Sequence, residues 1–206
     1  MPRLTQRERR VATRRRLIRA ADRHFQRRGF HAASLDRIAT EAEVTTGAVY
    51  AAFDGKADLF LKAYDAYLVD RLAEIASVVA TTEGNEATDV AARQFFAKTD
   101  RNRGWHMAWF EFRLHAARDE NLNRQVAERN KRLVEGIAAH YQRALEAAGG
   151  RDATPAALLI ARSFVSLGNG FALEQWTDPS VSADELVESS RALIAGLWAT
   201  AIEDPA

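Results

Sequence analysis

The stretch that decides the fold is residues 34–53, SLDRIATEAEVTTGAVYAAF. Apolar residues recur in it at helical spacing on both sides of a short interruption at Glu43-Val44. Ser34 and Thr45 precede the two runs, and serine and threonine are favoured residues at helix N-caps. The pattern therefore predicts two short helices joined by a tight turn, the second one running to about residue 53.

The flanking segments also have helical patterns. Thr5 followed by Glu8 has capping-box spacing, and Gly29 supplies a stop after a helix that begins as early as residue 6. A long helix begins at Lys56, and others are predicted at 86–99, 105–118, 121–147, 155–176 and 183–202, the last opened by Ser182 and Glu185. No period-two run of β-branched residues is present. We predict an all-α fold.

Charge is distributed unevenly along the chain. Residues 1–62 carry 14 lysines and arginines against 7 aspartates and glutamates, whereas the remaining residues carry 15 against 21. Eleven of the arginines lie within the first 28 residues. Lysine and arginine bind phosphates by displacing condensed counterions, so a basic end on an acidic body indicates a polyanionic partner at that end. A charge run alone is also compatible with an ordinary solvated helix face.

The composition excludes several classes of protein. The 206 residues are 47% hydrophobic and 28% charged, which is ordinary for a globular chain, and they include no cysteine. Disulfides, thiolate chemistry and cysteine-bound zinc are therefore excluded. No uninterrupted apolar run reaches the roughly 18 residues that a membrane span needs, and no apolar segment follows the basic N-terminus. We expect a cytoplasmic protein without membrane association.

Two short helices behind a basic helix are what a helix-turn-helix requires, because its second helix enters the major groove while the first braces the backbone. The segments TRRRLIRAADRHFQRRGF (13–30), SLDRIA (34–39), VTTGAVY (44–50) and FDGKADLF (53–60) closely resemble the DNA-binding domain of the tetracycline-repressor (TetR) family. The resemblance covers about a quarter of the chain, with the Tyr-x-x-Phe pair and the following lysine in register. It implies a helix-turn-helix DNA-binding domain at residues 1–62 and a helical effector-binding and dimerisation domain at residues 63–206.

The resemblance also implies which residues meet double-stranded operator DNA. Base contacts fall to Thr46, Gly47 and Ala51, with Arg37 on the bracing helix close to DNA. Phosphate contacts fall to Thr45, Tyr50 and Lys56, and Ser34 completes the predicted set. Hydroxyl and backbone N–H groups at a helix N-terminus suit phosphate or a base edge. Tyr50 could instead serve mainly in packing, and Val49 and Phe53 are assigned to the core.

The sequence departs from the family pattern in two ways. Glu43 stands where the family usually has a glycine at the turn, so the turn either holds a left-handed non-glycine residue, which costs about 1 kcal/mol, or uses another geometry. Ala51-Ala52 replaces a bulkier pair, so base contacts should be few and small, to thymine methyls and to DNA shape. The arginine-rich first 16 residues form either an arm that reaches DNA or a helical extension with an exposed basic face.

Aromatic residues gather in the predicted body of the protein, as in many small-molecule sites. The candidates for contact with an effector are Trp105, His106, Trp109, Phe112, Arg113, Phe164 and Phe171. The alternative is that the aromatic side chains simply fill the core. Glu111 and His115 lie one helical turn apart, but two ligands without a third nearby are a weak metal signal, so no metal is predicted.

The last two long helices carry apolar residues on more than one face, which exceeds what one core needs. Small residues there allow close helix approach. The residues predicted for a homodimer interface are Phe164, Gly168, Phe171, Leu193 and Leu197. The resemblance implies that these two helices pair with their copies as a four-helix bundle. The dimer would then present two DNA-binding domains to a pseudopalindromic operator.

We predict a DNA-binding transcriptional regulator, a repressor that a small-molecule effector releases from its operator, with the helix after Lys56 as the link. An enzyme is the first rival interpretation, but the sequence has no glycine-rich phosphate loop, no His-Glu-x-x-His and no recognisable catalytic triad. No catalytic residue or cofactor is therefore predicted. The sequence is also compatible with an architectural DNA-binding protein without an effector, with an activator, and with a regulator whose effector is a protein.

Overall fold

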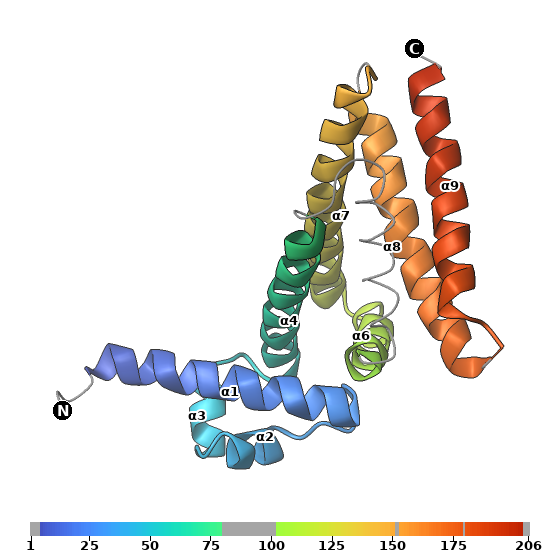
Figure 1. Ribbon diagram of the computed structural model, residues 1–206. Helices are drawn as coiled ribbons and strands as arrows, with labels where there is room; N and C mark the ends of the chain where they lie inside the picture. Colours follow the sequence, from blue (N-terminus) through green and yellow to red (C-terminus); the bar gives the residue numbers. More distant parts are fainter. Residues whose placement is uncertain (1–4, 80–101, 151–152, 179, 204–206) are drawn as a thin grey trace. The chain divides into compact units, whose positions relative to one another are not determined.

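The computed structural model of the chain describes residues 5–79, 102–150, 153–178 and 180–203 (Figure 1). Within these ranges every regular element is an α-helix, which confirms the predicted all-α fold. The helices are α1 Gln6–Arg28, α2 Leu35–Glu41, α3 Thr46–Tyr50, α4 Lys56–Val79, α6 Arg103–Ala116, α7 Glu120–Ala147, α8 Thr154–Thr177 and α9 Ala183–Glu203. The helix predicted at residues 86–99 lies outside the described residues.

The chain divides into two compact units. The N-terminal unit comprises residues 1–77 and 100–122, so α6 belongs to it together with α1, α2, α3 and nearly all of α4. The C-terminal unit carries most of α7 with α8 and α9. The predicted division of roles at residue 62 falls inside α4 and stays a prediction.

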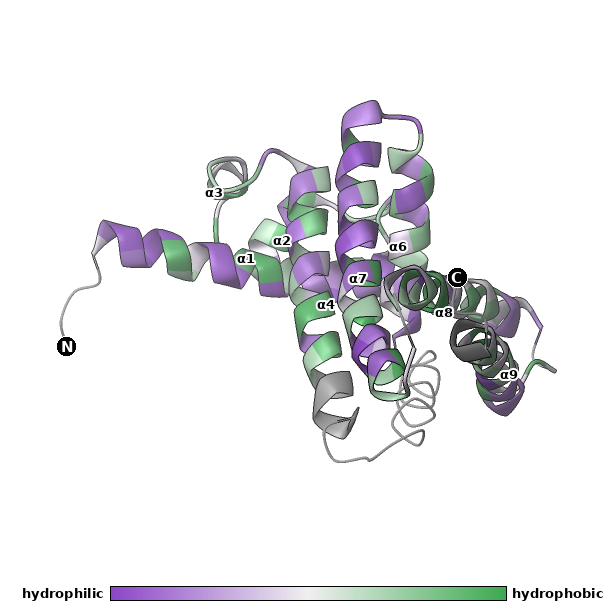
Figure 2. Cartoon of the chain, turned by 90° about the horizontal axis from the view of Figure 1, so that it is seen from above, coloured by the Kyte–Doolittle hydropathy of each residue, from purple (hydrophilic) through white to green (hydrophobic). Residues whose placement is uncertain are grey.

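Helix α1 has both of the ends that its sequence predicts. The Thr5 hydroxyl accepts a hydrogen bond from the Glu8 N–H at 3.2 Å, and the Glu8 carboxylate accepts one from the Thr5 N–H at 2.7 Å. Gly29 ends the helix with a φ of 73°, a conformation that only glycine adopts readily. The first turns, residues 6–12, are exposed and mostly hydrophilic (Figure 2). They form the helical extension of the second interpretation, and contact of this segment with DNA stays a prediction.

The core of the N-terminal unit is built around the ring of Phe60 on α4. Its centroid lies 4.9 Å from that of Phe25 on α1, 5.2 Å from Phe30 and 4.5 Å from Phe112 on α6. Val49 and Phe53 are buried, which confirms their assignment to the core. Helix α6 approaches α1 so closely that a Cβ on Gly104 would lie 2.3 Å from the Gln26 carbonyl oxygen. Only glycine fits at that position.

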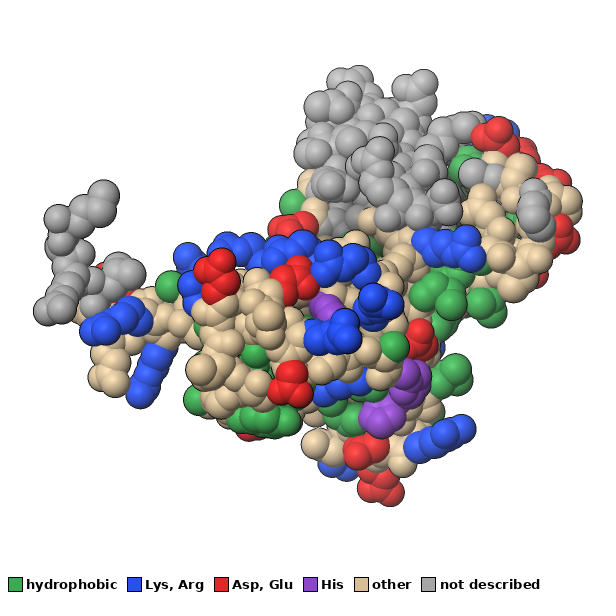
Figure 3. Space-filling model, turned by 90° about the horizontal axis from the view of Figure 1, so that it is seen from below, with side chains coloured by type: hydrophobic (Ala, Val, Ile, Leu, Met, Phe, Trp, Pro, Cys, Tyr) green, Lys and Arg blue, Asp and Glu red, His purple; other side chains and the backbone are tan. Residues whose placement is uncertain are grey.

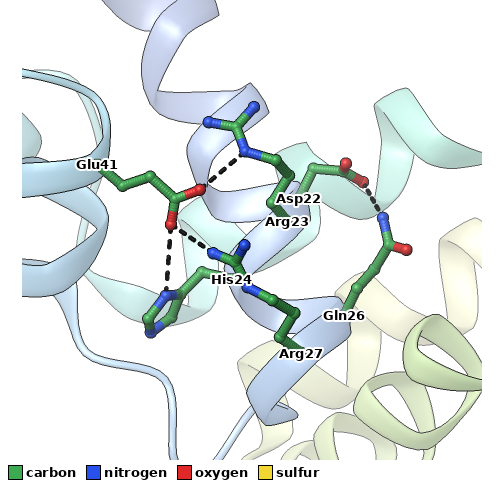
Figure 4. Close-up of polar contacts among 6 residues, drawn as sticks. All are labelled: Asp22, Arg23, His24, Gln26, Arg27 and Glu41. Atoms are coloured by element: carbon green, nitrogen blue, oxygen red, sulfur yellow. Dashed lines mark hydrogen bonds and ion pairs between the residues drawn. The ribbon is translucent and has the colours of Figure 1, made fainter.

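Glu41 joins α2 to α1 through two arginines (Figure 4). Its carboxylate pairs with Arg23 at 2.8 Å and with Arg27 at 2.7 Å, and the Arg23 hydrogen bond lowers the pKa of Glu41. The Nδ1 atom of His24 lies 3.8 Å from the same carboxylate. His24 is only 6% exposed, its Nε2 has no partner within the described residues, and burial lowers its pKa. The folded protein therefore favours neutral His24.

The C-terminal unit packs α7, α8 and α9 around a second core. Helices α8 and α9 lie side by side (Figure 1), and Ser182 and Glu185 form the predicted capping box before α9. Tyr141 of α7, Phe164 of α8 and Ile194 of α9 are among its buried residues. Helix α8 is long and apolar enough to cross a membrane, by length and composition alone. Of the 18 consecutive residues that are most apolar in it, 33% are buried inside the chain. Much of the apolar surface of α8 is therefore exposed to solvent in a single chain.

We predict that buried His24 makes the protein less stable as the pH falls through 6.5. The unfolded chain takes up a proton on this histidine near its ordinary pKa of 6.5, whereas the folded chain resists doing so. Urea unfolding between pH 7.5 and 5.5 should show a smaller pH slope for His24→Leu than for the wild type, by at most about 1.4 kcal/mol per pH unit.

The comparison must be between variant and wild type, because burial also lowers the pKa of His140 in the C-terminal unit. Glu41 acts in the same sense but at lower pH, since its lowered pKa keeps its contribution to stability intact above its ordinary value of 4.5 and that contribution is lost as the pH falls further. An identical slope in the variant and the wild type would show that His24 takes up its proton equally well in both states.

Candidate nucleic-acid interface

Helices α2 and α3 form the predicted helix-turn-helix. The turn between them places Glu43 at a φ of 54°, so the left-handed conformation that a glycine would adopt is present in a glutamate. Hydrogen bonds hold the turn: the Val44 N–H donates to the Ala39 carbonyl at 3.0 Å, and Arg16 donates to the Glu43 carbonyl at 3.1 Å. Of the two expectations for the turn, the left-handed one is confirmed, because Glu43 takes the conformation of the usual glycine.

Helix α3 and the residue after it expose two small residues and one tyrosine to solvent. Thr45 caps it, its Oγ1 accepting from the Ala48 N–H at 3.3 Å, while Val49 points into the core. Gly47, Tyr50 and Ala51 are exposed, Tyr50 to 63%. The interpretation in which Tyr50 serves mainly in packing does not describe this chain, because most of its side chain stands in solvent.

Arginines of α1 hold the motif in place. Arg14 donates to the Ala52 carbonyl just beyond α3, and its guanidinium lies 4.2 Å from the centroid of the Phe53 ring. Arg16 binds the turn before α3 through the Glu43 carbonyl. These two side chains bracket the two ends of α3, a role that the charge pattern alone did not reveal. The two acceptor carbonyls lie 38 and 27 residues along the chain, on either side of α3, so these bonds leave no local signal in the sequence.

Other arginines of the same helix remain available to a partner. Arg7, Arg9, Arg10, Arg15, Arg19 and Arg28 are exposed and make no ion pair with any described residue. Figure 3 shows the molecule from below relative to the view of Figure 1. Basic side chains gather on the face seen there, with a few acidic ones among them. The basic character of α1 is thus divided between internal support and a surface suited to phosphates.

Lys56 lies at the first residue of α4. Its Nζ donates to the His31 carbonyl at 2.8 Å and sits 4.9 Å from the centroid of the Phe30 ring. Partial burial lowers its pKa, while the nearby Glu111 carboxylate acts in the opposite direction. Lys56 therefore has a structural contact that the sequence did not predict, and two of its three N–H groups remain for another acceptor.

The remaining predicted DNA-binding residues lie on α2 and at its start. Ser34 occupies the N-cap of α2 but makes no side-chain capping bond, and Arg37 is exposed. Thr46 donates its hydroxyl hydrogen to Asp36 of α2 at 2.7 Å. Asp36 was not among the predicted site residues, although an acid in the first turn of the bracing helix is visible in the sequence. All the predicted DNA-binding residues belong to one compact unit.

The predicted effector residues are distributed over both units. Trp105, Trp109 and Phe112 are buried in the core of the N-terminal unit, with Trp109 stacked on Tyr64 at 4.0 Å. His106 and Arg113 are half-buried on the same helix. Phe164 and Phe171 belong to the C-terminal unit. Core filling describes the packing of the first three, and an effector role for any of the seven stays a prediction.

Two side chains of α6 make hydrogen bonds to α1 and to the segment that follows it. Trp105 donates from Nε1 to Asp22 of α1 at 2.8 Å, and Glu111 accepts from the His31 N–H at 2.9 Å. A cavity of about 300 Å³ opens beside this contact, lined by residues of α1 and α4 and by Asn102, and it contains none of the predicted effector residues. Helix α6, which follows residue 62 in the sequence, therefore makes direct hydrogen bonds to α1 and to the residue at position 31.

Comparisons with known proteins agree with this geometry. The sequence pattern of bacterial regulatory proteins of the tetR family matches residues 17–63, and that of the C-terminal domain of BetI-type transcriptional repressors matches residues 84–199. The nicotine-responsive transcriptional repressor HdnoR of Paenarthrobacter nicotinovorans is 29% identical over 178 residues, which cover 82% of this chain and 87% of that protein.

Solved structures share the fold. A transcriptional regulator of Pseudomonas aeruginosa PAO1 superposes with a TM-score of 0.73 at 24% identity, covering 99% of this chain and 97% of its own. The fatty acid degradation regulator FadR of Bacillus halodurans gives a TM-score of 0.68 at 18% identity, covering 88% and 97%. The helix-turn-helix and the two matching sequence patterns together establish that the chain belongs to the TetR family of bacterial regulatory proteins and is a DNA-binding transcriptional repressor.

Proposed function

We propose that the chain acts in the cytoplasm as a homodimer, in which each copy places α3 in the major groove of one half of a double-stranded operator. One arrangement carries this proposal: α3 buries Val49 and turns Gly47, Tyr50 and Ala51 outward from a unit rich in exposed arginines. A short helix with small exposed residues can approach base edges closely. Contacts to phosphate fix its register.

We propose phosphate contacts from residues at the start of α3, at its end and beyond it. Thr45 caps the helix and keeps its hydroxyl hydrogen free to donate, because its oxygen is the acceptor for Ala48. The phenolic hydroxyl of Tyr50 extends from the exposed face. Lys56 offers its remaining N–H groups, and the exposed arginines of the first turns of α1 extend the basic surface. These residues attract DNA of any sequence, and α3 supplies the selection.

The second copy is proposed to cover the open faces of α8 and α9. Leu159 and Leu173 of α8 and Leu193 of α9 are exposed large apolar residues, and a Cβ on Gly170 or Gly196 would meet nothing within 4 Å. Small residues beside exposed leucines allow two helices to pack closely. Of the predicted interface residues, Phe164 and Gly168 are buried within one chain, Phe171 and Leu197 are half-buried, and Leu193 is exposed.

The effector is proposed to act on the side of α6 that does not face α1. Helix α6 buries Trp105, Trp109 and Phe112, whereas Met107 and Leu114 are exposed and His106 and Arg113 half-buried. A ligand that favours a different position of α6 would strain or break the hydrogen bonds from α6 to Asp22 and His31. The DNA-binding helices would then be displaced. The similarity to a nicotine-responsive repressor supports a small aromatic molecule as the effector.

Removal of the Lys56 charge should weaken DNA binding without regard to sequence. Lys56→Ala is expected to lower affinity for operator and random duplex alike and to reduce the slope of log K against log salt by about one. Lys62→Ala, at a half-buried lysine farther along α4, is the matched control and should leave the slope unchanged. Fluorescence anisotropy over a salt series measures both. If Lys56→Ala lowers only thermal stability, the His31 contact is its whole role.

A charge at the proposed seam should separate the two copies. Leu193 is 40% exposed in one chain, so Leu193→Glu should spare the protomer fold, yield monomers in sedimentation velocity and abolish binding to a two-half-site duplex. Leu114→Glu, at a leucine that is 71% exposed on α6, is the control and should remain dimeric. If the Leu193→Glu variant remains dimeric, the dimer interface lies elsewhere.

Ligand release can be tested with nicotine as the probe. Titrated into the protein bound to a labelled operator, nicotine should lower anisotropy by weakening DNA binding roughly 5- to 150-fold, the usual range of allosteric coupling. His106→Ala should move the midpoint of this titration several-fold, whereas His115→Ala, at an exposed histidine of the same helix, should not. Equal midpoints would remove His106 from the effector site, and no release at any nicotine concentration would exclude this effector.

A further inference from the structure

The two threonines at the start of α3 have opposite hydrogen-bonding polarity. The Thr45 oxygen accepts from the Ala48 N–H, which leaves its hydroxyl hydrogen available to an outside acceptor. Thr46 does the reverse: its Oγ1 lies 2.7 Å from Oδ1 of Asp36, and a carboxylate oxygen can only accept. The single hydroxyl hydrogen of Thr46 is therefore directed to Asp36. Towards any ligand, Thr46 offers lone pairs and a methyl group.

We propose that Asp36 is a specificity-determining residue of this repressor, because it makes Thr46 a hydrogen-bond acceptor towards the DNA base it meets. This role of Asp36 rests on the proposed docking of α3 in the major groove. In that groove adenine and cytosine present amino donors, whereas guanine presents only the acceptors N7 and O6. An acceptor at Thr46 selects adenine or cytosine on the contacted strand and opposes guanine.

The position of Asp36 makes this arrangement persistent. Asp36 lies in the first turn of α2, the bracing helix, and Thr46 is the first residue of α3, so their bond spans the turn between the two helices. Arg16 and Arg14 fasten the segments on either side of α3 to α1. A free threonine hydroxyl rotates to donate or to accept as its partner requires. Here the carboxylate of a neighbouring helix fixes that choice before DNA arrives.

A carboxylate beside the reading helix also repels phosphate. Asp36 is exposed, so its charge should lower affinity for every sequence in addition to orienting Thr46. The two effects can be separated by a control acid. Glu43, exposed in the same turn, makes no side-chain bond to Thr46, so Glu43→Gln removes a negative charge from the motif without changing the threonine.

The test is a binding selection from a randomised duplex library, carried out on the full-length wild type, Asp36→Ala, Thr46→Val and Glu43→Gln. The wild type should enrich a two-half-site sequence in which one position prefers adenine or cytosine over guanine by about 5- to 10-fold. Asp36→Ala should reduce that preference to less than about 2-fold, since the freed hydroxyl can then donate to guanine. Glu43→Gln should keep it while raising affinity for all sequences.

Thr46→Val probes the same bond from its other end and keeps the shape of the side chain. It should lose the preference at that position alone, which also protects the test if Asp36→Ala fails to fold. Unchanged base preferences in both Asp36→Ala and Thr46→Val, with a wild type that still enriches its operator, would overturn this inference and leave the proposed function standing. A wild type that enriches no sequence would overturn both.

Discussion

The close approach of α6 to α1 is the constraint on which the rest of the N-terminal unit depends. Gly104 brings the start of α6 against the Gln26 backbone, where no other residue fits, and Trp105 then reaches Asp22. The aromatic residues of α6 complete the core around Phe60 that also positions α4. A helix that lies far along the chain from the DNA-binding segment therefore supports that segment from within.

The arginines of α1 show how one basic helix can serve two purposes. Guanidinium groups make directed, multiple hydrogen bonds, so Arg14 and Arg16 can hold backbone carbonyls at the two ends of α3. Arg23 and Arg27 neutralise Glu41 between α1 and α2. The exposed arginines then add long-range attraction to a polyanion. Rigid support and electrostatic attraction thus come from the same helix, and the small residues of α3 are presented in a fixed orientation.

Local patterns in the sequence predicted the elements well, because capping boxes, helix stops and apolar spacing act over a few residues. Thr5 with Glu8 and the Gly29 stop have local sequence signals, whereas the left-handed conformation of Glu43 is expected only from the resemblance to the family. The bonds from Arg14 to Ala52, Glu111 to His31 and Trp105 to Asp22 join residues 38, 80 and 83 positions apart, and no local pattern encodes them. Aromatic composition likewise could not distinguish the buried Trp109 from a residue that lines a cavity.

Two copies of α3 reading the major groove of one operator would shield guanine N7, an atom of that groove, from chemical attack. Dimethyl sulfate methylation of guanine N7 on a duplex that the protein selects therefore tests the proposed docking most directly. We expect protection from methylation in two patches about one helical turn, ~34–36 Å, apart, or a multiple of that spacing. Guanine N7 methylation as fast as in free DNA, or protection in a single patch only, would contradict the docking of a dimer through α3.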